Sequence, residues 1–157
     1  MYAVNRTIEK VVLAADSRYL ASNELSLLEN YFQSYRNRMM VYQEMRDKNK
    51  MLLEKSLDRF FLDYPDFLEK HRKRCIYDMS ETLRYIALSI LKDDQNFFKE
   101  RLMIWFDSIL LAYNKTAPCA IAYRYLQEVI KENLSPNSAR LIKPYLDQVC
   151  DSLESHV

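Results

Sequence analysis

The chain has 157 residues, of which 49% are hydrophobic and 29% are charged, with a formal net charge of +1. This composition can fill one sizeable core, so we expect a single domain over residues 1–157 and exclude a disordered or collagen-like chain. The chain contains no glycine. Phosphate-binding loops and dinucleotide folds need glycine where the backbone approaches phosphate, so both classes of enzyme are excluded, and an all-α fold is favoured. The near-neutral charge predicts no nucleic-acid partner.

The first part of the chain predicts two helices. Apolar residues recur at helical spacing between positions 4 and 15 and predict a short helix. A stripe of apolar side chains from Leu25 to Tyr42 predicts a second helix that buries this stripe and is capped by Ser22 or Asn23. A polar cluster interrupts the stripe before it resumes and ends at Pro65, so one bent helix and two separate helices both remain open.

Four further helices are predicted over residues 69–91, 97–113 and 117–131 and from Pro136 onward. Asp93 or Asp94 is expected to cap the second of these helices. Pro144 predicts a kink or a late start in the last one, because proline lacks a backbone donor and clashes with the preceding turn. This series of helices of unequal length favours a globin-like arrangement over a four-helix bundle.

The sequence shows no pattern of residues that predicts catalysis, metal binding or membrane insertion. Two histidines and three widely spaced cysteines do not form a metal-ligand pattern, and no nucleophile has a recognisable base near it, so we expect no metal and no enzyme. No run of about 18 apolar residues predicts a transmembrane segment. An odd number of cysteines and a charged start to the chain predict a cytoplasmic protein with reduced thiols.

One stretch carries a candidate binding site. Cys75 and Asp78 are three residues apart on a predicted helix and share a face, with Thr82 one turn further along. A basic run, from His71 to Arg74, precedes them. A buried free cysteine beside a solvated basic face explains this pattern. A covalently held, anionic, nitrogen-rich ligand is the alternative: the thiol tethers the ligand, the carboxylate accepts hydrogen bonds from ring N–H groups, and the basic residues neutralise acid groups.

At these residues the sequence resembles the phycobiliproteins, in particular allophycocyanin subunits. The family's bilin-bearing helix reads Cys-x-x-Asp followed by Leu-Arg, which corresponds here to Cys75, Asp78, Leu83 and Arg84. Other matching segments are Ala15-Asp16, Arg18-Tyr19-Leu20, Glu24-Leu25, Tyr113-Asn114 with Pro118, Leu134-Ser135 and Tyr145-Leu146-Asp147. The resemblance implies a globin-like, phycocyanin-like domain with an N-terminal helical pair, in which residues 1–20 form an assembly helix and turn.

The resemblance also implies a cofactor. A phycocyanobilin-type linear tetrapyrrole is expected in thioether linkage to Cys75 rather than to the other two cysteines, with Asp78 facing its central pyrroles. Contacts to its propionates are expected from Arg72, Arg74 and His71, the arginines ranking first. Tyr77 and Thr82 complete the expected site. Two departures from the family stand out: Tyr77 occupies the place of an arginine found in many members, and the segment between Pro65 and Cys75 is shorter.

The resemblance further implies a partner. Asp16 is expected to pair across a subunit interface with Arg84, flanked by Arg18 and Tyr19. The partner is expected to be another phycobiliprotein-like subunit, in a homo- or heterodimer that extends to a ring, because a short apolar helix at the N-terminus cannot bury its face alone. The alternative is that this helix caps the core of its own domain.

The function that the resemblance implies is that of a bilin-binding, light-harvesting or energy-transfer subunit of, or associated with, a phycobilisome core. Such a protein would be cytoplasmic and associated with the thylakoid through the phycobilisome, without a transmembrane segment. Two alternatives are a chromophore-free structural or regulatory subunit that uses only the assembly surface, and a soluble bilin photosensor.

Overall fold

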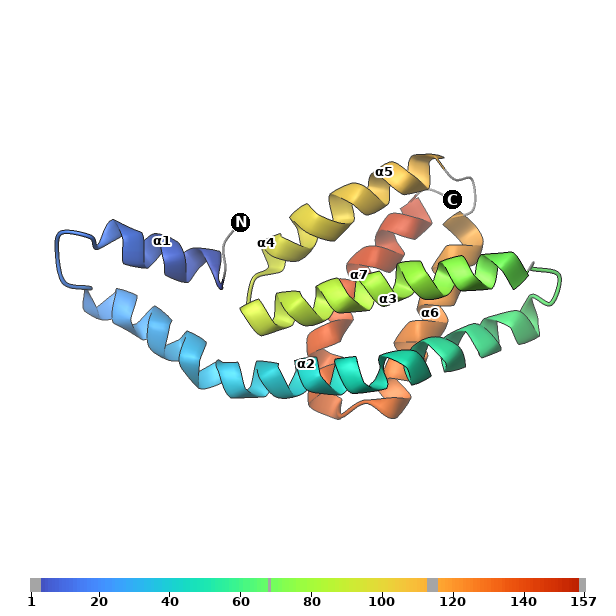
Figure 1. Ribbon diagram of the computed structural model, residues 1–157, viewed down its shortest axis with the longest axis horizontal. Helices are drawn as coiled ribbons and strands as arrows, with labels where there is room; N and C mark the ends of the chain where they lie inside the picture. The colour runs from blue at the N-terminus through green and yellow to red at the C-terminus, as the bar shows by residue number, and fades with distance from the viewer. Residues whose placement is uncertain (1–3, 68, 113–115, 156–157) are drawn as a thin grey trace.

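A computed structural model describes residues 4–67, 69–112 and 116–155, and within them the chain is helical and contains no strand. The elements are α1 (Arg6–Ala14), α2 (Ser22–Asp63), α3 (Glu69–Lys92), α4 (Gln95–Phe98), the π-helical segment η1 (Lys99–Met103), α5 (Ile104–Ala112), α6 (Thr116–Asn133) and α7 (Pro136–Ser155) (Figure 1). The all-α prediction is confirmed. Tyr113 and Asn114, which were matched to a helix joint, lie outside the described residues.

Helix α2 is continuous over 42 residues, so one helix rather than two spans this part of the chain, and its ribbon is bowed (Figure 1). The predicted cap at Ser22 or Asn23 is wrong, because the residue before the helix is Ala21. Glu24, in the first turn, accepts a hydrogen bond from the Ala21 N–H at 2.7 Å and binds Arg18 through both carboxylate oxygens. A carboxylate near a helix N-terminus also interacts favourably with the helix dipole, so this arrangement replaces a side-chain cap.

The helices predicted over 69–91 and 117–131 agree closely with α3 and α6, whereas the single helix predicted over 97–113 is divided between the end of α4, η1 and α5. Asp94 is the residue that caps the helix after α3, since its carboxylate accepts from the Phe97 N–H at 3.1 Å. Helix α7 begins at Pro136 and continues through Pro144, so the predicted late start is wrong. The carbonyl that loses its donor to Pro144 belongs to Arg140, an exposed residue, and water can take the place of the missing N–H.

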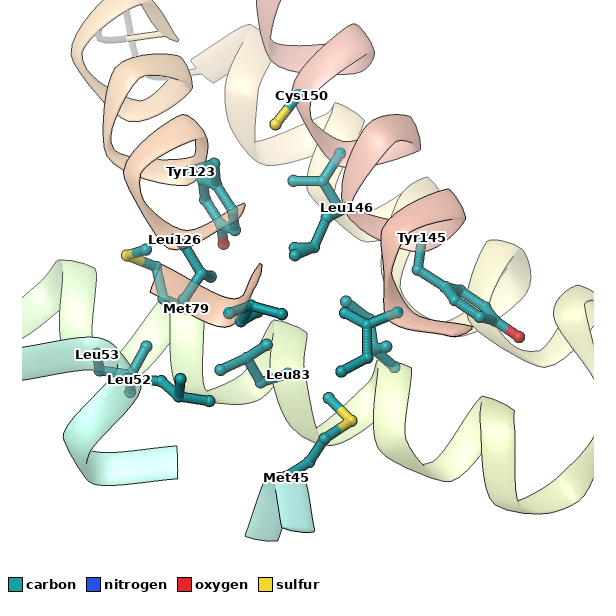
Figure 2. Close-up of a cluster of buried hydrophobic side chains, with 14 of the residues drawn as sticks. Met45, Leu52, Leu53, Met79, Leu83, Tyr123, Leu126, Tyr145, Leu146 and Cys150 are labelled. Carbon is teal, nitrogen blue, oxygen red and sulfur yellow. The ribbon is translucent and has the colours of Figure 1, made fainter. Parts of the chain in front are cut away.

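The core lies where α2, α3, α6 and α7 meet. Figure 2 shows side chains from these four helices in one cluster, and α3 contributes a stripe of buried apolar side chains to the core. Its members are Leu83, Ile86, Ala87 and Ile90. Each aliphatic side chain that is fully removed from water stabilises the fold by about 1.5–3 kcal/mol. The four helices therefore form the body that positions the remaining elements.

The first part of α2 behaves differently from the rest. Together with α1 and the turn between them it forms what we call the N-terminal arm, residues 4–40, and Figure 1 shows α1 lying beside this end of α2, away from α6 and α7. The predicted burial of the stripe is wrong here, since Leu25 is 52% exposed and Phe32 67% exposed. No residue of α1 is buried. The arm extends past the helices that would otherwise cover it.

Polar contacts fix the arm to the body. The Asn5 side chain caps α1 and donates to the carbonyls of Lys92 and Asp93 at 3.1 and 2.6 Å. Arg38, a buried residue of α2, donates to the Leu91 carbonyl. These groups satisfy carbonyls at the C-terminus of α3, which have no partner within their own helix. The arm is thus held in place by hydrogen bonds at the end of α3, while its apolar side chains stay exposed.

Glu44 of α2 joins this helix to the start of α7. Its carboxylate accepts from the hydroxyls of Ser138 and Ser135 at 2.6 and 2.9 Å, from the Ser135 N–H at 3.0 Å and from Lys48 Nζ at 3.0 Å. Burial by itself would raise the pKa of Glu44, but the hydrogen bonds from Ser138, Lys48 and Ser135 together lower it to about 2. The ionised carboxylate therefore stabilises the folded chain.

Glu44→Gln is expected to lower the free energy of unfolding at pH 7 by about 2 kcal/mol, because charge-assisted hydrogen bonds are lost. The pKa of Glu44 rises on unfolding, so its contribution is present above the unfolded pKa of 4.5 and is lost as the pH falls from there towards 2. Thermal denaturation of wild type and Glu44→Gln at pH 7 and pH 3 measures this pH-dependent contribution. Glu54→Gln, at an exposed site of α2, is the control. If the difference in melting temperature between wild type and Glu44→Gln is as large at pH 3 as at pH 7, the stabilising role of the ionised Glu44 carboxylate is contradicted.

Candidate functional site

A cavity opens between α3, α5 and α6, with a contribution from α7. Including its mouth, which is open to solvent, it encloses about 1060 Å³. Its apolar lining includes Met79 of α3, Phe106 and Ile109 of α5, and Leu153 of α7. Trp105 of α5, 43% exposed, also lines it. A concave apolar site with a few polar groups is the usual form of a small-molecule site.

Four of the side chains that were predicted to contact a ligand line this cavity. They are His71, Arg74, Cys75 and Asp78, all on α3. Offsets of three, four and seven residues put them on one face of the helix, a placement that the sequence spacing predicted for Cys75 and Asp78. The Cys75 thiol is partly accessible and is not in a disulfide. Thiol and carboxylate therefore share one apolar space.

Two predicted contacts lie elsewhere. Arg72 donates to the Asp58 carboxylate of α2 at 2.6 Å, and its guanidinium lies 5.2 Å from the centre of the Phe61 ring. Tyr77 is 65% exposed, and neither residue is among those that line the cavity. Tyr77 diverges from the face of α3 that carries Cys75, because two helical steps rotate it by about 200°. Arg72 is three residues from Cys75 and is held away from the cavity by its bond to Asp58.

Thr82, the last predicted contact, is fully buried behind the cavity wall. Its hydroxyl lies 3.0 Å from the Asp78 carbonyl and 2.9 Å from the hydroxyl of Tyr123, which does line the cavity. The structure therefore connects Thr82 to the cavity through a tyrosine on a different helix, α6.

Burial affects both acid groups of the site. Burial raises the pKa of the Cys75 thiol, and the nearby Asp78 carboxylate raises it further. Burial also raises the pKa of Asp78, against the opposing effect of Arg74, whose Nε lies 3.5 Å from the carboxylate. The thiol is thus protonated at neutral pH, and a reaction at its sulfur requires removal of that proton.

Several residues that line the cavity were not predicted from the sequence. Trp105, Phe106 and Ile109 fall in the segment predicted only as the most apolar helix, and Cys119 and Tyr123 lie on α6. The aromatic content of residues 97–113 was the one available signal. Which helix packs across from α3 is a tertiary property, so the helical pattern alone did not identify these residues.

The residues predicted to lie at an interface occupy two separate regions. Asp16, Arg18 and Tyr19 belong to the turn of the N-terminal arm, where Tyr19 is 98% exposed. Arg84 lies on α3, binds the Glu81 carboxylate at 2.6 Å, and lines a hollow between α2 and α3 that encloses about 560 Å³, its open mouth included. The expected pairing of Asp16 with Arg84 is one between subunits, and this arrangement leaves both side chains at the surface.

Over the described part of the chain, no helix is both long and apolar enough to cross a bilayer. Within the same residues, no three or more histidine, cysteine, aspartate or glutamate side chains are grouped as metal ligands would be.

A family model and the related proteins found by sequence comparison point to the same family. A family model described as "Phycobilisome protein" matches residues 10–153. The chain is 25% identical to the allophycocyanin alpha-B chain of Porphyra purpurea over 156 residues, which cover 90% of this chain and 95% of the relative. It is 30% identical to the alpha-B chain of Cyanidium caldarium over 99 residues, covering 57% and 61%. The allophycocyanin beta chain of a Synechococcus species is 24% identical over 160 residues, covering 93% and 97%.

These matches confirm the resemblance seen in the sequence and the globin-like fold class. Phycobiliproteins harvest light and are not enzymes, so the prediction that this chain is not an enzyme is confirmed too. The family typically binds bilins and assembles from related subunits. With a cavity that holds the family's Cys-x-x-Asp pair and a family match over most of its length, the chain belongs to the phycobilisome protein family.

Proposed function

We propose that this chain binds a phycocyanobilin-type linear tetrapyrrole through a thioether to Cys75 and acts as a light-harvesting, energy-transfer subunit of, or associated with, a phycobilisome core. The observation that carries the proposal is the presence of Cys75 and Asp78 on one wall of a single apolar cavity. We further propose that residues 1–157 form one phycobiliprotein-like domain, since the family match extends over residues 10–153.

The side chains of the cavity fit the chemistry of such a ligand. The bound tetrapyrrole would supply the absorption of visible light. Asp78 accepts hydrogen bonds from pyrrole N–H groups, and Arg74 and His71 on the same wall meet the acidic side chains of the ligand. Phe106 and Ile109 exclude water and hold the ligand rigid. A rigid chromophore loses less of its excitation to internal rotation.

Production of the chain together with a bilin pathway and bilin lyases tests the proposal. Denaturing electrophoresis followed by zinc-induced fluorescence reports covalent pigment directly, because only attached pigment migrates with the polypeptide. A fluorescent band and a visible absorption band are expected. A colourless protein under conditions that load an allophycocyanin subunit would overturn the bilin assignment.

Asp78→Asn is expected to keep the covalent pigment while shifting its absorption and lowering its emission. The amide retains the size of the carboxylate but removes the charge that strengthens contacts to pyrrole N–H groups. Absorption and fluorescence spectra at equal pigment loading measure the effect. Asp47→Asn, at an exposed site of α2 that does not line the cavity, is the matched control. An unchanged spectrum in the Asp78 variant contradicts the role of this carboxylate.

We propose that the N-terminal arm binds another phycobiliprotein-like subunit in a homo- or heterodimer, and that such dimers extend to rings. The arm supports this because it is fixed in place by polar contacts while its apolar side chains are exposed. Through such an assembly the protein would be located in the cytoplasm, at the cytoplasmic face of the thylakoid.

Asp16→Arg is expected to weaken the dimer about fivefold, by replacing an attraction to Arg84 of the partner subunit with a repulsion. The effect stays modest because Arg84 keeps its bond to Glu81 within its own chain. Sedimentation equilibrium measures the dissociation constant. Asp47→Arg, at an exposed site of α2 outside the arm, is the control. An equal dissociation constant in both variants contradicts the pairing.

A chromophore-free structural subunit is the second candidate. Two observations favour it: Arg72 is engaged by Asp58 instead of facing the cavity, and Tyr77 replaces an arginine of the family. In that case the cavity stays without pigment and the arm alone carries the function. The loading experiment above separates the two candidates.

A further inference from the structure

Tyr123 of α6 lies at the back of the cavity, only 3% exposed. Figure 2 shows its ring extending from α6 toward the side chains of Leu126 and Met79. Its hydroxyl reaches α3, where it lies 2.9 Å from Thr82 Oγ1. This hydroxyl therefore lies between two helices and close to the wall that carries Asp78.

The hydrogens of this pair can be assigned by counting donors. Thr82 has one hydroxyl hydrogen, and it donates to the Asp78 carbonyl one turn earlier at 3.0 Å. Thr82 Oγ1 must then accept from the Tyr123 hydroxyl. The only hydrogen of the phenol points toward α3, and the lone pairs of its oxygen remain available as acceptors.

The buried environment of Tyr123 keeps its phenol protonated. Burial raises the pKa of Tyr123 far above its usual value, so the hydroxyl keeps its hydrogen under all ordinary conditions. Cys119, Asp78 and Cys75 are close enough to act electrostatically on it, which places the Tyr123 oxygen near the polar part of the cavity. All three of these side chains line the same space.

We propose that Tyr123, contributed by α6, is a second hydrogen-bond acceptor for the ligand beside Asp78, and that the cavity selects a conjugated ligand that presents N–H groups to both side chains. The inference rests on the proposed function and deepens it. Asp78 provides a charged acceptor from α3, and Tyr123 a neutral one from α6, oriented by Thr82. Together they distinguish a ligand rich in N–H donors from an apolar molecule of equal size.

Reversible binding provides the test. In a Cys75→Ala background, which prevents attachment, purified protein is titrated with free phycocyanobilin and the affinity is read from its absorption. Tyr123→Phe is expected to weaken binding about fivefold, the equivalent of one ordinary hydrogen bond. Thr82→Val is expected to weaken it similarly, because the phenol then turns its hydrogen toward the ligand. Tyr125→Phe, on the same helix but bonded to Asp63 on the outside, is the matched control.

The outcomes separate this inference from the proposed function. Circular dichroism and thermal denaturation identify a variant that fails to fold, and the other variant then carries the test. Affinities of Tyr123→Phe and Thr82→Val equal to that of the Tyr125→Phe control overturn the role of Tyr123 alone. A protein with Cys75 intact that takes up no pigment, and whose Cys75→Ala form binds no phycocyanobilin, overturns the proposed function and this inference together.

Discussion

Replacement of Cys75 by alanine is expected to abolish covalent pigment completely. The chain produced with a bilin pathway and lyases should give a zinc-fluorescent band, and the Cys75→Ala chain none. The reason is that a thioether needs a thiol at the cavity wall, and Cys75 is the one that shares its helix face with Asp78. Fluorescence per unit of stained protein, together with the intact mass, measures the loss.

The two other cysteines provide controls of different kinds. Cys150 is completely buried, so Cys150→Ala should keep all of its pigment. Cys119 lines the same cavity from α6, so Cys119→Ala tests whether a second thiol in the same space contributes to attachment. Pigment that persists through denaturation in Cys75→Ala would falsify the assignment, and its loss in Cys119→Ala would transfer the attachment site to α6.

Phe32→Asp is expected to weaken assembly at least a hundredfold while leaving the fold of the chain intact. Phe32 is 67% exposed on the N-terminal arm, so the change removes no core packing. A partner that covers this face would bury the ring, which contributes about 1.5–3 kcal/mol, and would have to desolvate the new carboxylate. Sedimentation velocity across a range of concentrations, alone and mixed with allophycocyanin subunits, measures the dissociation.

Asn30→Asp is the matched control for this experiment. It introduces the same charge two residues earlier, on the opposite side of α2, where a partner on the apolar face would not cover it. Equal melting temperatures would confirm that all three proteins are folded. If wild type and Phe32→Asp sediment alike as monomers at high concentration, or associate equally, the arm is not the assembly surface.

The helices of the body were predictable because their apolar spacing and their caps are local properties. The predicted helix over 69–91 differs from α3 by one residue, and Asp94 is one of the two predicted caps. Two local predictions failed for identifiable reasons. The start of α2 uses Glu24 and Arg18 in place of a Ser22 cap, and α7 accommodates Pro144 where the freed carbonyl is exposed.

Burial was less predictable than helix formation. The apolar stripe that begins at Leu25 is as regular as that of α3, yet Leu25 and Phe32 are exposed. Periodicity identifies which residues share a helix face, whereas burial requires another element to pack against that face. The arm extends beyond α6 and α7, so no helix among the described residues buries Leu25 or Phe32 (Figure 1).

For the candidate site, the sequence by itself determined that Cys75, Asp78, Arg74 and His71 share one helix face, since helical geometry relates residues three and four positions apart. Only the tertiary structure decided what lies across from that face. Side chains from α5 and α6, Tyr123 among them, complete the cavity, and Arg72 is drawn away by Asp58 of α2. Contacts between distant segments depend on how the helices pack, and helical periodicity carries no information about the partner of a face.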